Sequence, residues 1–580
     1  MDPSTSPGRP RKRRAINACV ACRISKVRCD GNRPCQRCDR NAVPCQYHSA
    51  VKDETSLRIE KLESKVIALG EKVDDISSRG NATRPDQVLA PMAPHSRDRN
   101  AASTAVEAGL FTWSQATVWF QSFFSGSHYL VPIFCERHDT IESVSSRSPF
   151  LFDVIVGIGC RAEEGFNSTT YRQLQSRARD QITNLLVNTN VPSLEDVQAI
   201  TLMAAYSENS FVLVALALRF AMQLGLPRAV DQLVARGHSR SGPVDSEERE
   251  LYRLCRIWHG ICNLELFFSL DGGKLPSMVL HTSSRKIRSL VTHPARTEVD
   301  VRLLSQIELN IIRADAYNKI TLHAGDSLLP QDETELRRVV DDTGVELTLW
   351  LEEWAAVVST EPIPHQRSIA LQNLHIQREW AMMTLHLKAI TTSGIENIAF
   401  MTEFQRDFVR RAKEAAARHL HHVLEDSSSP YSSPTLRAQS HGSTYLSTFR
   451  WTLDYVWAKC AFSILLVLKL AILLRDPVPS VMQLLRDAHR VLEELKRVTV
   501  GHIAYFQILQ TSIEKCEAAL TEYATQQNTS SESDRNGVAE DEFQGYVPNE
   551  FVFEWDFPGL SLKHMPLGWQ DLFINIDSLF

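Results

Sequence analysis

Six of the twelve cysteines in this chain lie close together near its N-terminus, at spacings that suit metal binding. They form a duplicated unit in which a Cys-x2-Cys pair is followed, after six further residues, by a third cysteine. The six are Cys19, Cys22, Cys29, Cys35, Cys38 and Cys45. Three thiolates leave a tetrahedral Zn²⁺ one ligand short, whereas six complete two tetrahedra if two sulfurs bridge both metals. The count therefore predicts a binuclear site with two Zn²⁺ ions per chain.

The segment that carries these cysteines is too short to fold by apolar packing alone. Residues 19–45 cannot form a hydrophobic core, so metal binding must supply the folding free energy, on the order of 10 kcal/mol or more. The polar, basic N-terminus has no apolar region typical of a secretory signal, so we expect an intracellular chain with reduced thiolates. A metallothionein-like metal store is the alternative, but it would need many more cysteines and no large body.

The cysteine block resembles the fungal Zn₂Cys₆ transcription factors. The stretches 19–30 and 33–38, CVACRISKVRCD and RPCQRC, follow that family's pattern closely. The resemblance implies that two cysteines bridge the metals and that each zinc is completed by two more. By this assignment the bridging ligands are Cys19 and Cys35, one zinc is completed by Cys22 and Cys29, and the other by Cys38 and Cys45.

The same resemblance implies that the block binds double-stranded DNA. The family's base-reading lysine falls on Lys26, and a Lys donor to guanine in the major groove suits the CGG triplets that members commonly read. Some members have a second basic residue just before this lysine, where this chain has Ser25. Five arginines around the cluster are candidate phosphate contacts, or else solvated surface charges. They are Arg23, Arg28, Arg33, Arg37 and Arg40.

Charge is distributed very unevenly along the 580 residues. The chain carries a net charge of −6, yet residues 1–50 hold eleven Lys/Arg against three Asp/Glu, a balance of +8 that leaves −14 for the rest. A basic head on an acidic body indicates a polyanionic partner for the head alone. The basic tail, residues 1–18, contains Arg11, Lys12, Arg13 and Arg14, which predict a nuclear-import signal, a phosphate-binding arm, or both. We therefore expect a nuclear protein.

Residues 59–76 show a heptad pattern, between linkers at 46–58 and 77–106. Position a is β-branched and position d is mostly Leu, which favours a parallel two-stranded coiled coil and hence a homodimer. The predicted seam consists of Ile59, Leu62, Val66, Leu69, Val73 and Ile76. Eighteen residues are close to the marginal length for a helix in water, so we expect weak pairing by the coil alone. The alternative is a helix that packs on its own chain.

The fold class expected for the rest is mostly α, with one large all-α body at 107–525. Apolar residues recur every three or four positions at 246–268, 303–324, 333–358, 375–392, 404–424 and 481–495. Ser193 and Asp196 have the spacing of a capping box. The stretches 215–227 and 252–278 resemble the regulatory domain of fungal transcription factors. That resemblance implies a regulatory body, which would bind an effector metabolite or mask an activation segment.

Two other features of the body bear on function. His419, His421 and His422 lie within one predicted helix but lack an apparent Asp, Glu or Cys partner in helical register, so we expect surface histidines rather than a metal site. The apolar run 461–474 is too short and too charged to span a bilayer, so we expect a buried helix and no membrane partner. No phosphate loop, nucleophile elbow or HExxH motif is present, which argues against an enzyme.

The C-terminal segment, 526–580, changes character. Its last forty residues contain nine aromatics and seven acids against one Lys. This composition is typical of disordered activation segments that contact the transcription machinery, although the aromatics could instead pack on the body. The sequence thus predicts an activator of RNA polymerase II transcription that reads CGG-type sites as a homodimer. The alternative is a metabolite-sensing regulator or repressor.

Overall fold

The computed structural model divides the chain into two compact units, Met1–Arg99 and Asn100–Phe580, which are described separately. The described residues are 19–46, except 26, 28, 31 and 33, and 103–521, except 166, 188–190, 207–209, 240–242, 272–274, 279–283, 324–331, 391–401, 426–444, 475, 499–505, 507–508, 511–512, 515 and 519. The basic tail, the heptad segment and the C-terminal segment lie outside the described residues.

The first unit contains two short helices, α1 (Val20–Ile24) and α2 (Gln36–Arg40). The two ends of its described part are joined, because the Val20 N–H donates to the Gln46 carbonyl at 2.8 Å. The side chains buried inside this unit are cysteines: Cys19, Cys22, Cys29, Cys35 and Cys38.

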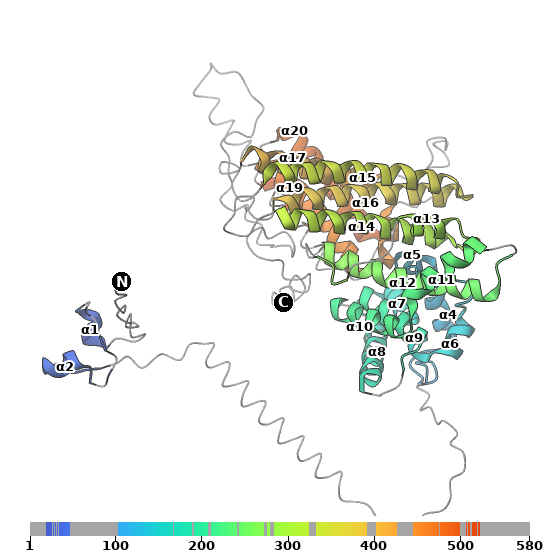
Figure 1. Cartoon of the computed structure of the whole chain (residues 1–580), viewed down its shortest axis with the longest axis horizontal. Helices are drawn as coiled ribbons and strands as arrows, with labels where there is room; N and C mark the ends of the chain where they lie inside the picture. Colours follow the sequence, from blue (N-terminus) through green and yellow to red (C-terminus); the bar gives the residue numbers. More distant parts are fainter. Residues whose placement is uncertain are drawn as a thin grey trace, which may run out of the picture. The chain divides into compact units, whose positions relative to one another are not determined.

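The second unit is helical in every element that the structure describes (Figure 1). Its first half consists of α4 (Trp113–Ser122), the π-helix η1 (Phe123–Ser127), α5 (His128–Leu130), α6 (Ile141–Arg147), α7 (Pro149–Glu164), α8 (Thr169–Val187), α9 (Leu194–Ala205), α10 (Ser210–Gln223) and α11 (Leu226–Ser239). Its second half consists of α12 (Ser246–Asp271), α13 (Ser284–Val291), α14 (Glu298–His323), α15 (Glu333–Ser359), α16 (Pro364–Ala389), α17 (Glu403–Leu424), the 3₁₀ helix η3 (Tyr445–Trp451), α19 (Asp454–Leu473) and α20 (Val478–Val498).

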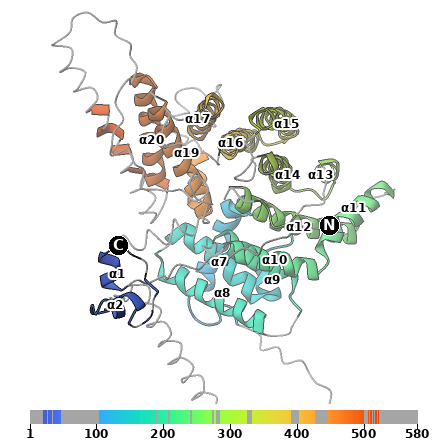
Figure 2. The same ribbon diagram turned by 60° about the vertical axis from the view of Figure 1, so that its left-hand side comes forward.

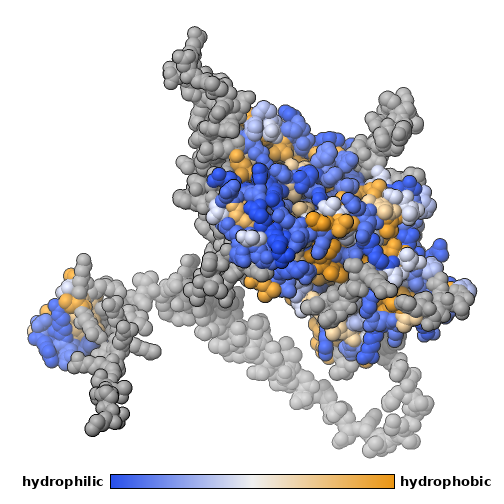
Figure 3. All heavy atoms as spheres, turned by 45° about the horizontal axis from the view of Figure 1, so that its top comes forward, coloured by the Kyte–Doolittle hydropathy of each residue, from blue (hydrophilic) through white to orange (hydrophobic). Residues whose placement is uncertain are grey.

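Long helices dominate the second half. Helices α14, α15, α16 and α17 run side by side in Figure 1, and Figure 2 views them nearly end-on. Each packs on its neighbour in this series through an apolar stripe, as expected for amphipathic helices. The buried residues form one continuous hydrophobic core from Ala105 to Leu520. The face seen in Figure 3 is mostly hydrophilic, with apolar side chains interspersed.

The helices predicted from periodicity are confirmed, and most of their ends agree to within a few residues. The exception is α16, which begins at Pro364 rather than near 375. Proline fits the first helical position, and the polar residues after it hide the apolar period. The capping box is also present, since the Asp196 N–H donates to Ser193 Oγ at 3.1 Å and the Ser193 N–H donates to Asp196 Oδ2 at 2.8 Å.

The packed body starts earlier than the boundary expected at residue 107. Thr104 and Ala105 are buried, and the Ala105 N–H donates to Asp153 Oδ1 at 2.8 Å. Arg177 donates to the Ser103 carbonyl at 2.7 Å. The carboxylate and the guanidinium that hold residues 103–105 against the body come from α7 and α8. The composition of residues 103–106 therefore could not reveal that the body begins there.

The surface location expected for three histidines is wrong for His419, which is only 4% exposed. It lies on the face of α17 that packs against α16 and α19. His421 is exposed, and His422 is half-buried with its Nδ1 atom 3.1 Å from Glu425 Oε2, a carboxylate partner that the sequence analysis missed. Among the described residues, the groups of side chains that could hold a metal ion consist of cysteines.

The apolar run 461–474 lies in α19, and its residues up to Leu468 are buried, as predicted. Within the described residues, no single helix is long and apolar enough to cross a membrane. The pair Phe211–Gln223 and Leu226–Arg236, bent by 54°, passes the same test of length and composition when taken together.

Candidate metal centre

The two halves of the cysteine block fold in the same way. Each helix begins one residue after the first cysteine of its unit and carries the second, so α1 follows Cys19 and holds Cys22, while α2 follows Cys35 and holds Cys38. Residues three apart lie on the same side of a helical turn, which directs both sulfurs inward. Cys35 is the N-cap of α2, and its sulfur accepts from the Cys38 N–H at 3.4 Å.

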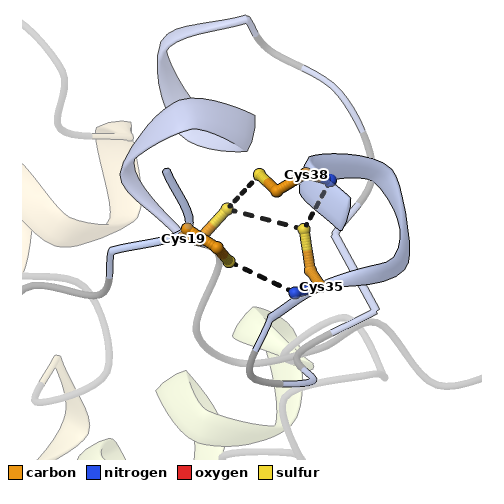
Figure 4. Close-up of side chains that lie close together, drawn as sticks. Cys19, Cys35 and Cys38 are labelled. Carbon is orange, nitrogen blue, oxygen red and sulfur yellow. Dashed lines mark hydrogen bonds between the residues drawn. The ribbon is translucent and has the colours of Figure 1, made fainter. Parts of the chain in front are cut away.

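The sulfur atoms stand at separations that suit a shared metal. Cys19 Sγ lies 3.7 Å from Cys35 Sγ and 3.6 Å from Cys38 Sγ (Figure 4). The Cys22 and Cys35 sulfurs are 3.6 Å apart. Tetrahedral zinc with Zn–S bonds of about 2.3 Å would place its sulfurs about 3.8 Å apart. The observed separations are therefore close to those of tetrahedral thiolate coordination.

The six sulfurs fall into two groups of four that have two members in common. Within each group the ligand atoms lie no more than 4.8 Å from one another. One group contains Cys19, Cys22, Cys29 and Cys35, and the other contains Cys19, Cys35, Cys38 and Cys45. Two four-sulfur sites that share two sulfurs provide the ligands for a pair of tetrahedral ions.

Backbone amides favour the thiolate form of the two shared cysteines. Hydrogen bonds from the backbone N–H of Cys22 and of Cys38 lower the pKa of Cys19 and of Cys35, respectively. Burial, by contrast, raises the pKa of Cys22 to about 12. A thiol of this kind is protonated without metal, so loading the site must release protons.

Asp30 organises the loop between the two halves, a role that the sequence analysis missed. Its Oδ2 accepts from the Gln36 N–H at 3.1 Å, and its Oδ1 accepts from the Asn32 N–H at 3.4 Å. The hydrogen bond from Gln36 lowers the pKa of the Asp30 carboxyl. The available signal was an Asp followed by Gly, which favours a turn closed by the carboxylate.

The structure describes only some of the residues predicted to contact DNA. Lys26, Arg28 and Arg33 lie outside the described residues, as does the side chain of Arg23. Arg37 and Arg40 are exposed on α2. Arg37 also forms a hydrogen bond with the Cys22 thiol that favours its thiolate form, so this residue supports the cluster as well.

Comparison with known proteins bears on the same segment. Residues 17–54 match the fungal Zn(2)-Cys(6) binuclear cluster domain. A transcriptional regulatory protein of Saccharomyces cerevisiae is 50% identical over 46 residues, covering 8% of this chain and 6% of that protein. The thiamine repressible genes regulatory protein thi5 of Schizosaccharomyces pombe is 41% identical over 44 residues, covering 8% and 5%. The matching domain and the geometry agree that this segment binds two zinc ions.

One similarity is longer. The transcriptional activator of proteases prtT of Emericella nidulans is 22% identical over 244 residues, covering 41% of this chain and 35% of that protein. This alignment is longer than the whole of the first unit, so it extends into the helical body. The chain spans between 5% and 35% of the length of these relatives.

The helical body contains a buried charge cluster that periodicity did not reveal. Asp271 on α12 forms an ion pair with Arg313 on α14 and accepts from Lys459 on α19 at 2.9 Å. Trp380 Nε1 on α16 also donates to Asp271, at 2.9 Å. Burial opposes ionisation, but the two cations outweigh it and lower the pKa of Asp271 to about 2. These contacts tie four helices together.

Proposed function

We propose that this protein is a sequence-specific DNA-binding transcription factor that activates RNA polymerase II transcription in the nucleus. The observation that carries the proposal is the pair of four-sulfur sites that share Cys19 and Cys35, within a segment that matches the fungal binuclear cluster domain. In this proposal the two shared cysteines bridge the zinc ions. Relatives that are named as transcriptional regulators support the same function.

The proposed mode of DNA binding separates base reading from positioning. Lys26 donates to guanine in a CGG-type half-site, while the surrounding arginines contact phosphates and carry no sequence information. The heptad segment 59–76 pairs two chains, so that a symmetric dimer reads two half-sites. The helical body is the regulatory domain, and the C-terminal segment 526–580 contacts the transcription machinery.

Substitution of Lys26 tests this proposal. Lys26→Ala should weaken binding of the full chain to a CGG-containing duplex by about ten- to a hundred-fold, or about 1–3 kcal/mol, and relax its preference over a scrambled duplex. Arg40→Ala is the matched control. It should weaken binding to both duplexes equally and reduce the salt dependence by about one phosphate contact. Fluorescence anisotropy at several salt concentrations measures both effects, and an unchanged preference in Lys26→Ala would contradict the proposal.

A second candidate function is a metabolite-sensing regulator or repressor whose body binds a small effector. The observation that favours sensing is a large cavity in the helical body, lined by α14, α16 and η3.

A further inference from the structure

The helical body encloses a cavity large enough for a metabolite. Its volume is about 690 Å³, and it lies among η1, α5, α14, α16, η3 and the end of α20. Sites for small organic ligands typically have volumes of about 300–1,000 Å³ and mostly apolar walls. Aliphatic side chains make up much of this wall, including Leu130, Val299, Val301, Val358, Ile369 and Leu374.

Arg302 on α14 lines this cavity without an ion-pair partner among the described residues. Its Nε is buried and makes no hydrogen bond, and no described carboxylate lies within ion-pairing distance of its guanidinium. Desolvation by burial lowers the pKa of Arg302. The side chain as a whole is half-buried, so its charge is partly removed from water and an anion at the guanidinium would compensate it.

Other buried arginines of the body are compensated. Arg256 pairs with Asp300 at 2.6 Å, and Arg313 pairs with Asp271. Five arginines, Arg313 among them, share with Arg302 a buried Nε that lacks a hydrogen bond among the described residues. All five donate through another nitrogen to a carboxylate or a carbonyl: Arg161, Arg253, Arg288, Arg313 and Arg378. Within the described part of the chain, Arg302 is thus the exception among them.

The two acidic side chains of the lining do not pair with Arg302. Glu361 pairs with Arg296 at 2.8 Å, and Glu298 accepts from Gln366 Nε2, a neutral amide of the same lining, at 2.9 Å. Arg450, a second arginine of the lining, already pairs with Glu163 at 2.7 Å. The charge of Arg302 therefore remains available to a ligand.

A second polar group of the lining also lacks a partner. The Oδ1 atom of Asn373 on α16 is buried without a hydrogen bond among the described residues, although the residue is only 5% exposed. A side-chain amide can present either an acceptor or a donor to a bound molecule. Arg302 and Asn373 thus provide two polar groups without a hydrogen-bond or ion-pair partner among the described residues, in a cavity whose wall is partly aliphatic.

One part of the cavity wall comes from the π-helix η1 and the 3₁₀ helix η3. Gly126 of the π-helix η1 lies directly against the Trp451 ring of η3, and a Cβ atom at Gly126 would stand 2.2 Å from that ring. The Trp451 carbonyl accepts from the Tyr206 hydroxyl at 2.8 Å. π-helical turns are frequent at functional sites. Here the turn admits a tryptophan that closes one side of the cavity.

We infer that this cavity binds a small organic carboxylate with an apolar body. The carboxylate meets the guanidinium of Arg302, and the apolar part lies along the aliphatic wall. The Oδ1 atom of Asn373 is an acceptor and remains available to a hydroxyl or N–H donor on a ligand that carries one. A monoanion matches the one positive charge of the Arg302 guanidinium, whereas a phosphate dianion would leave excess negative charge in the cavity. This inference gives the sensing role a ligand class and does not depend on DNA binding by the zinc cluster.

Calorimetric titration of the full, zinc-loaded chain with dodecanoate tests the inference. Saturable binding of one dodecanoate per chain is expected, with dodecanol and inorganic phosphate each at least about tenfold weaker, because each lacks one half of the recognition. Arg302→Met should weaken dodecanoate binding by about ten- to a hundred-fold. It should also raise the thermal midpoint of the ligand-free protein, since an uncompensated buried charge is removed. Arg486→Met, at an exposed arginine of α20 outside the lining, should change neither result.

Three outcomes would overturn the inference. They are the absence of saturable dodecanoate binding, equal binding of dodecanol or phosphate, and unchanged binding in Arg302→Met. Arg302→Lys retains the charge and should keep part of the affinity, so it provides the same comparison if the Met variant does not fold. DNA binding measured on the same variants should stay unchanged, which separates a failure of this inference from a failure of the DNA-binding proposal.

Discussion

The two units of this protein keep their folds by opposite means. In the first, the buried side chains are cysteines, while Ile24 is 78% exposed and Val43 is 46% exposed. In the second, one continuous apolar core extends from Ala105 to Leu520. The first unit therefore depends on metal coordination for its folding free energy, whereas the second depends on apolar burial.

This difference also separates the kinds of site that each unit offers. The ligands of the metal centre come from 27 consecutive positions, 19–45, so their chemistry is concentrated in local sequence. The contacts of the body come from distant elements, as in the cluster where Asp271 meets Lys459 from a helix 188 residues further along. Substitutions in the short segment should therefore leave the core of the second unit unaffected.

Removal of zinc should have the largest effect and should affect only one unit. A zinc chelator should unfold residues 19–46 and abolish DNA binding, because metal coordination supplies on the order of 10 kcal/mol or more of folding free energy there. The helical signal in far-UV circular dichroism and the thermal midpoint of the body should stay unchanged. Added zinc should restore DNA binding. A body that unfolds together with the cluster would contradict the claim that the two units keep their folds independently.

The sequence predicted the metal centre and the helices better than it predicted the contacts between helices. Cysteine spacing is local, and an apolar stripe marks a helix wherever it packs, so both could be recognised without tertiary structure. The partner of Arg302, or its lack of one, depends instead on which helices surround it. The prediction for His419 failed for the same reason, because its pattern on α17 does not reveal that α16 and α19 cover it.

Where two helices of the body cross closely, the addition of a single methyl group should lower the free energy of unfolding. A Cβ atom at Gly159 of α7 would lie 1.8 Å from the Trp119 carbonyl oxygen of α4, so backbone must move to admit it. We expect Gly159→Ala to lower the free energy of unfolding of the body by about 3 kcal/mol. Urea unfolding followed by circular dichroism measures this change.

Gly157→Ala, on the same helix, is the matched control. A Cβ atom there would stand 3.5 Å from Leu174 Cβ, which is an ordinary contact. Because alanine favours the helix over glycine by about 1 kcal/mol, this variant should be as stable as the unchanged protein or slightly more stable. Equal destabilisation by both variants would show that the crossing of α4 and α7 is not the cause. DNA binding should persist in both, since the metal centre lies in the other unit.

The smallest expected effect concerns pH and the buried histidines. Burial lowers the pKa of His419 to about 3, whereas an unfolded histidine titrates near 6.5, so between these values the unfolded chain binds the extra proton and stability falls as pH falls. From about pH 7 to pH 5.5, His419 should account for a loss of about 1 kcal/mol in the free energy of unfolding. His419→Leu should remove that part of the loss, while His421→Leu, at the exposed histidine two residues away, should retain it.

Urea unfolding of the body at both pH values measures the difference, and an equal pH dependence in the two variants would contradict a neutral, buried His419. Such a result would mean that apolar packing in this unit does not control protonation as its burial indicates.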